Sequence, residues 1–169
     1  KTVKALAFLT ITVLLFNQSH AQLKLPVLNG IGNDVKKVIE DYPNRFVHLM
    51  GEIVAEHPQS TDYQCNFNVN NAEESIITRY SAKKEVCSWQ AVMLTTDNFE
   101  KAKQKFKSLF NQLNNLSVNS GKAAFRLKGI YEPPEETKKF TSVLFSLDPA
   151  NKKIKKLKIE VSLQYTEPM

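Results

Sequence analysis

The sequence predicts an α+β fold, a two-layer domain in which helices cover one face of an antiparallel sheet. Two segments, 33–42 and 97–116, place apolar residues three and four positions apart, as one buried face of a helix requires. Each is followed by stretches in which apolar and polar residues alternate, which is the period of a half-buried strand. Because one helix and three strands occur in this order twice, over 33–95 and 97–166, we expect two such units side by side.

Residues 1–21 have the features of a secretory signal peptide. A short basic start precedes an apolar run over 5–16, which falls short of the roughly 20 residues that a helix needs to cross a bilayer. Small residues occupy both positions of an A-x-A-like site that ends at Ala21. We expect cleavage before Gln22, export to the periplasm or the cell exterior, and a single folded domain over 22–169.

The first unit begins with a helix that Asn33 can cap. Its buried face consists of Val35, Val38, Ile39 and Tyr42. Pro43 interrupts this helix, and the apolar residues within 46–50 are compatible with either a helix or a strand. Alternation then predicts three strands joined by short turns, over 65–69, 75–81 and 86–94.

The second unit begins with the clearest element of the sequence. Asp97 and Glu100 form a capping-box pattern. The helix that follows has one continuous apolar stripe, made of Phe99, Ala102, Phe106, Leu109, Phe110, Leu113 and Leu116. Turn residues at 119–121 end it, and alternation separated by prolines predicts strands over 125–131, 140–147 and 157–165.

Two units of this kind, set side by side, resemble the TATA-binding protein saddle and the β-lactamase-inhibitor proteins at the level of the fold only. The resemblance rests on the order of elements and on no shared motif. It implies no function, because one architecture serves many activities.

The two cysteines, Cys65 and Cys87, are subject to two opposing arguments. Export to an oxidising compartment favours a disulfide between them. A three-strand meander would place another strand between them, at about 9.6 Å for two strand spacings, whereas a disulfide requires Cα atoms within about 7 Å. Both outcomes remain open at this point.

Positive charge is concentrated in the second half of the chain. Residues 97–169 contain 14 Lys or Arg and 8 Asp or Glu, whereas residues 22–96 contain 7 and 9. Nucleic acid is a common partner of basic proteins, but export separates this chain from it, and the lysines are not interleaved with aromatic residues. Alternation places four cations on the open face of the second sheet: Arg126, Lys128, Lys156 and Lys158.

These four residues are the candidate ligand-binding site, and the expected partner is anionic: a polysaccharide, a lipid head group or an acidic protein. The alternative is an exported metal-dependent hydrolase, suggested by a group of His and Glu side chains at four-residue steps: His48, Glu52, Glu56 and His57. Gly51 disfavours the helix that this spacing needs, and the string matches neither H-E-x-x-H nor H-x-x-E-H.

No catalytic motif stands out elsewhere. There is no G-x-S-x-G elbow and no glycine-rich phosphate loop, so we assign no catalytic residue and expect no cofactor. No segment after the signal peptide is long and apolar enough to span a membrane. The sequence therefore favours an exported binding or interaction module without catalysis.

Overall fold

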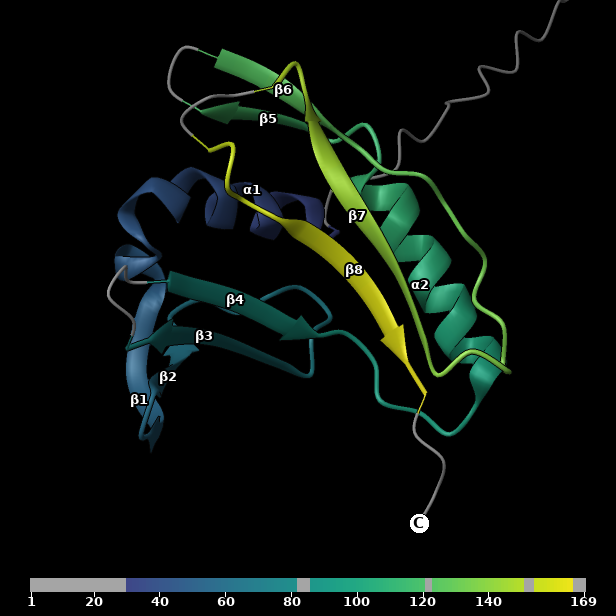
Figure 1. The fold of residues 1–169 in the computed structure, drawn as a ribbon, viewed down its shortest axis with the longest axis horizontal. Coiled ribbons are helices and arrows are strands. Elements are labelled where there is room, and N and C mark those ends of the chain that lie inside the picture. The colour runs from purple at the N-terminus through teal and green to yellow at the C-terminus, as the bar shows by residue number, and fades with distance from the viewer. Residues whose placement is uncertain (1–29, 82–85, 121–122, 151–153, 166–169) are drawn as a thin grey trace, which may run out of the picture.

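The computed structural model describes residues 30–81, 86–120, 123–150 and 154–165. Within these ranges the chain forms two four-stranded antiparallel sheets, ordered β1-β2-β3-β4 and β5-β6-β7-β8, and one α-helix precedes each sheet in the sequence (Figure 1). The predicted α+β class with antiparallel sheets is confirmed. The predicted number of strands was wrong by one in each unit, because the sequence analysis missed β1 and β5. The strand predicted over 65–69 was also misplaced, since it overlaps β2 only at Cys65. The segment predicted to be a signal peptide, residues 1–21, lies outside the described residues.

The first unit contains α1 and the first sheet. Pro43 ends α1 and initiates a short 3₁₀ turn, and a second 3₁₀ turn precedes β1. The segment that was compatible with helix or strand therefore contains both a turn and the start of a strand. The elements are α1 Gly32–Asp41, η1 Tyr42–Asn44, η2 Val47–Leu49, β1 Met50–His57, β2 Ser60–Cys65, β3 Glu74–Tyr80 and β4 Val86–Val92.

The missed strand β1 is irregular, which explains why alternation did not reveal it. Its register with β2 shifts twice, and its side chains are mostly exposed without a period of two. Gly51 permits the close approach of the two strands, because a Cβ atom there would lie 2.9 Å from the carbonyl oxygen of Gln64.

The second unit begins with α2 (Phe99–Leu113), whose cap is Asn98 and not the predicted Asp97. The Asn98 side chain accepts a hydrogen bond from the backbone N–H of Lys101 at 2.9 Å. The helix ends before Leu116, because Asn115 has a positive φ of 69°. The strands that follow are β5 Ser117–Ser120, β6 Ala123–Lys128, β7 Phe140–Asp148 and β8 Ile159–Gln164.

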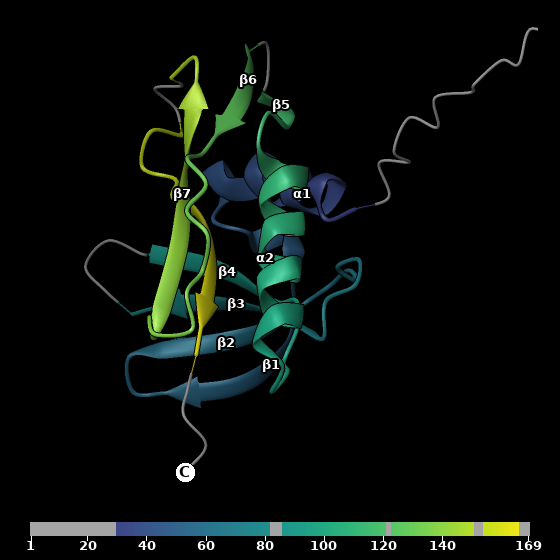
Figure 2. The same ribbon diagram turned by 90° about the vertical axis from the view of Figure 1, so that its right-hand side faces the viewer.

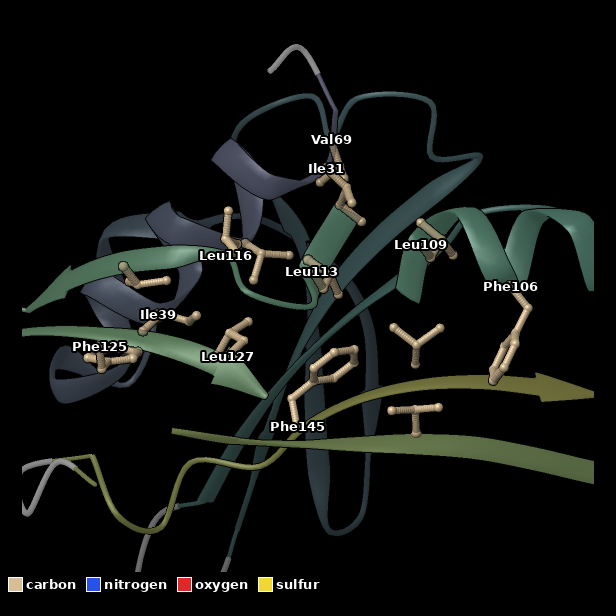
Figure 3. Packing of buried hydrophobic residues seen from close by; sticks show 14 of the residues in the cluster. Ile31, Ile39, Val69, Phe106, Leu109, Leu113, Leu116, Phe125, Leu127 and Phe145 are labelled. Carbon is tan, nitrogen blue, oxygen red and sulfur yellow. The ribbon is translucent and has the colours of Figure 1, made fainter. Parts of the chain in front are cut away.

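One hydrophobic core joins the two units. Helix α1 of the first unit packs against β5 of the second, and α2 packs against β8. Figure 3 shows Ile39 of α1 gathered with Phe125 and Leu127 of β6 in the same buried cluster. The strands of the second sheet run nearly upright in Figure 2, while those of the first run across the view. The units are thus repeated in topology but are not separate in packing.

Cys65 and Cys87 are not joined by a disulfide. Cys65 ends β2, and Cys87 lies on β4 opposite Arg79, so β3 runs between the two cysteine strands. Of the two outcomes that the sequence left open, the structure has the meander.

We expect two reactive thiols per chain when the purified protein is unfolded in the absence of reductant. Two strand spacings hold the sulfur-bearing strands too far apart for a disulfide to close in the folded protein. Titration with a chromogenic thiol reagent in denaturant measures the number, and a reduced sample should give the same value. A count near zero would mean that the strand order is different.

Candidate functional site

The second sheet has one face toward the core and one face away from it. On the central strand β7, Thr141, Val143 and Phe145 are buried, whereas Leu144 is 58% exposed and Phe140 is 55% exposed. We call the exposed side the outer face. Its residues are Arg126 and Lys128 of β6, Phe140, Ser142, Leu144, Ser146 and Asp148 of β7, and Glu160, Ser162 and Gln164 of β8.

Two of the four predicted cations lie on β6. Arg126 and Lys128 are exposed and alternate with the buried Leu127, as the sequence predicted. Asp148 lies opposite Arg126 in the ladder with β7, and Ser146 lies opposite Lys128. The Lys128 Nζ also donates a hydrogen bond to the side-chain carbonyl oxygen of Asn115, so this ammonium group is held in place on the surface.

The other two predicted cations precede β8. The strand begins at Ile159, two residues later than expected, because the backbone N–H of Leu157 donates to the carbonyl of Ile154 in a turn. Lys156 and Lys158 are therefore exposed on a connection and not on a strand.

The positions of Lys158 and Lys128 are nevertheless related. In the ladder between β7 and β8, Ile159 pairs with Phe145. Lys158 precedes Ile159 and therefore lies beside Ser146, the residue of β7 that pairs with Lys128 of β6. The two lysines flank that end of β7, on the order of two strand spacings apart, about 10 Å.

The outer face also contains features that the sequence analysis missed. Leu144 and Phe140 are exposed apolar side chains, and Asp148 and Glu160 are carboxylates on the same side. The sequence pattern did not reveal that Phe140 and Leu144 are exposed, because large apolar residues occur in both alternating sets of positions along β7. The face is therefore mixed in character, with cations, carboxylates, serines and two uncovered hydrophobic side chains.

Three exposed cations on the outer face and on the connection before β8 have no carboxylate partner in the described part of the chain. These cations are Arg126, Lys156 and Lys158, and within the described ranges no carboxylate lies at ion-pair distance from any of them. Charges exposed to water in this way act over about one Debye length, roughly 10 Å at 0.1 M salt.

Two surface groups outside the outer face have shifted pKa values. A hydrogen bond from the backbone N–H of Thr95, at 3.0 Å, holds the pKa of the Glu73 carboxyl below its usual value. Glu132 and Glu135, with oxygens 2.9 and 3.4 Å from the Lys138 Nζ, raise the pKa of that lysine. Lys138 is balanced by these two carboxylates, so it is not part of the candidate site.

The His and Glu group of the alternative hydrolase interpretation is not assembled into a metal site among the described residues. His48 lies in a 3₁₀ turn with its Nδ1 2.7 Å from Asp41 Oδ1, and His57 ends β1 with its Nε2 3.4 Å from Asp62 Oδ2. Glu52 and Glu56 lie on β1, which is a strand and not the helix that the spacing required. Among the described residues, no three His, Cys, Asp or Glu side chains are placed to share a metal ion.

Comparison of the chain with protein-family models, with curated proteins and with solved structures gives no match. No helix within the described ranges is long and apolar enough to cross a membrane.

Proposed function

We propose that the protein is an exported, non-catalytic binding module that uses the outer face of its second sheet to bind the acidic surface of another protein. The observation that supports this most strongly is that Leu144 and Phe140 are exposed on the same face as Arg126, with Lys158 at the edge of that face, and that in the described part of the chain neither cation lies within ion-pair distance of a carboxylate. The apolar start of the chain supports export.

The combination of apolar and charged side chains is what a protein interface needs. Uncovered hydrophobic residues rimmed by polar ones commonly mark interaction sites on soluble proteins. Leu144 lies in the middle of the face and can be desolvated by a partner, while Lys128 and Lys158 lie at one end. The cations then contribute to orientation and to the rate of association more than to affinity.

The carboxylates of the outer face distinguish a protein from the other anionic partners. Asp148 lies opposite Arg126, and Glu160 lies opposite Leu144. A uniformly anionic polysaccharide or lipid surface would be repelled by both carboxylates. A protein surface can place its own basic or neutral groups against them, so the mixed face favours a protein.

The test compares two variants that each lose three positive charges. One carries R126Q, K128Q and K158Q on the outer face and its edge, and the other carries K101Q, K105Q and K107Q on α2. We expect the outer-face variant to bind immobilised acidic proteins from the exported fraction at least tenfold more weakly, because three local attractions are lost, and the helix variant to change less than twofold. A third variant, Leu144→Ser, should weaken binding without changing its salt dependence.

Three results would contradict the proposal. Equal losses in both charge variants would mean that only net charge matters. Stronger retention on a sulfated polysaccharide or on anionic vesicles than on acidic proteins would assign the face to those partners. Binding that is unchanged in all variants would leave the outer face as an ordinary solvated surface.

A further inference from the structure

Strand β7 is longer than the strand that pairs with it on one side. It spans Phe140–Asp148, and β8 pairs with its residues 140–145. On the other side, β6 pairs only with residues 146–148. In the described part of the chain, no strand therefore lies beside residues 140–145 on the side of β6. We call this side of β7 the open edge.

The connection from β6 to β7 leaves the open edge without hydrogen bonds. The backbone N–H of Gly129 donates to Asn114 Oδ1, at the end of α2, at 3.2 Å. Tyr131 then packs on Phe110 of α2, with ring centroids 5.1 Å apart, and Figure 1 shows the connection passing beside that helix before it returns to β7. Among the described residues, no backbone hydrogen bond joins 129–138 to 140–145.

The hydrogen bonds on the side of β8 determine which backbone groups face the open edge. The Tyr165 N–H donates to the Lys139 carbonyl at 2.9 Å, so these opposite residues form a bonded pair. In an antiparallel ladder, bonded and non-bonded pairs alternate. The backbone groups of the odd-numbered residues of β7 therefore point toward β8. The N–H and C=O groups that point to the open edge are those of Phe140, Ser142 and Leu144.

The open edge lacks the features that usually keep a strand from pairing with another chain. Edge strands commonly contain charged residues, prolines or bulges. Residues 140–147, FTSVLFSL, contain neither a charge nor a proline, and they pair with β8 without a register shift. The exposed side chains of Phe140 and Leu144 lie on the outer face beside this edge. Backbone groups and apolar side chains that can bind an extended chain thus occur together.

We propose that an extended segment of the protein partner adds to the open edge as a strand antiparallel to β7, in line with β6. Its backbone pairs with the N–H and C=O groups of Phe140, Ser142 and Leu144, which follow the spacing of an extended chain. Its side chains opposite Phe140 and Leu144 are apolar, because directly opposite side chains are in contact across a ladder. This mode of binding rests on the function proposed above, since the added strand extends the same outer face.

The first test needs no ligand. Amide hydrogen exchange of the free protein is followed residue by residue by NMR. The N–H groups of Ser142 and Leu144 should exchange about a hundredfold faster than those of Val143 and Phe145, which are bonded to β8. Slow exchange at both Ser142 and Leu144 would overturn the proposal, because their N–H groups would already be paired.

The second test supplies a strand. The probe is a capped peptide of alternating valine and threonine, N-methylated at the threonines so that only one of its edges can form hydrogen bonds. The control peptide is N-methylated at every residue. At about millimolar concentration, the probe should slow exchange at Ser142 and Leu144 at least about tenfold, and the control should have no effect, because it has lost its backbone donors. Equal effects of the two peptides, or no effect of the probe, would overturn the proposal.

Two variants at one position test the edge with a protein partner. Ser142→Pro removes an N–H that faces the open edge, so the ladder with β8 is retained and circular dichroism should show a folded protein. It should bind the acidic proteins of the exported fraction at least about tenfold more weakly. Ser142→Ala keeps the N–H and should weaken binding much less.

The outcomes separate this inference from the proposed function. If Ser142→Pro binds acidic proteins as well as the wild-type protein does, while the outer-face charge variant binds them weakly, the proposed function stands and strand addition is overturned. If the probe peptide protects Ser142 and Leu144 but no acidic protein binds, strand addition stands and the proposed partner is wrong.

Discussion

Replacing Leu127 with alanine is expected to lower the free energy of unfolding by about 3 to 4 kcal/mol. Leu127 is 0% exposed and belongs to the cluster in which β6 packs with both helices. The substitution removes buried methyl groups and leaves a cavity that a close-packed core cannot fill completely. Ile39→Ala in α1, at a position that is 1% exposed, should cost a similar amount.

Both variants should shift the same cooperative unfolding transition, in which the two units unfold together. Urea unfolding is followed by circular dichroism and by the fluorescence of Trp89, which lies on β4 of the first sheet. Because the core spans both units, the two signals should coincide and move together in Leu127→Ala and in Ile39→Ala. Leu144→Ala is the control, since its side chain is 58% exposed on the same sheet and should change stability by less than about 0.5 kcal/mol. Separate transitions for the two signals would show that the units fold independently.

Replacing Asp41 with alanine is expected to cost about 3 kcal/mol. The carboxylate accepts hydrogen bonds from the Asn44 side chain, the His48 ring and the His48 backbone N–H. Hydrogen bonds to charged groups contribute about 1.5 to 3 kcal/mol each. Relaxation of the loop and access of water to the exposed donors make the net cost smaller than this sum. Without the carboxylate, Arg45 and Phe46 can leave their left-handed conformations, which cost roughly 1 to 2 kcal/mol each. This relaxation offsets part of the free energy that the lost hydrogen bonds contributed.

Thermal and urea unfolding of Asp41→Ala measure this effect. Asn44→Ala is the matched control, because it removes only one of the three donors and should cost about 1 kcal/mol. If Asp41→Ala were as stable as the wild-type protein, the loop between α1 and β1 would not depend on the carboxylate.

The elements predicted most accurately are those whose periodicity is regular and whose environment is simple. Helix α2 has one apolar stripe and a polar remainder, and it was predicted to within three residues of its observed end. Strand β1 was missed because it is an edge strand with two register shifts and with Ile53 and Val54 exposed. Alternation depends on one face being buried, and this strand has no such face.

The candidate site was predictable only in part. Arg126 and Lys128 were placed on the correct face, because they alternate with buried residues on one strand. The relation of Lys158 to Lys128 depends on the pairing of three strands, and the exposure of Leu144 depends on which parity of β7 faces the helices. Neither the relation between the two lysines nor the exposure of Leu144 can be predicted from the hydrophobic pattern of one strand alone.

The sequence by itself determined the α+β class, the existence of both helices and the faces of the regular strands, because these follow from periodicities that involve residues a few positions apart. Only the tertiary structure decided that the two units share one core, that β3 separates the cysteines, and that His48 is hydrogen-bonded to Asp41. These features depend on contacts between residues far apart in the chain, and such contacts form only when loops close and side chains compete for the same buried space.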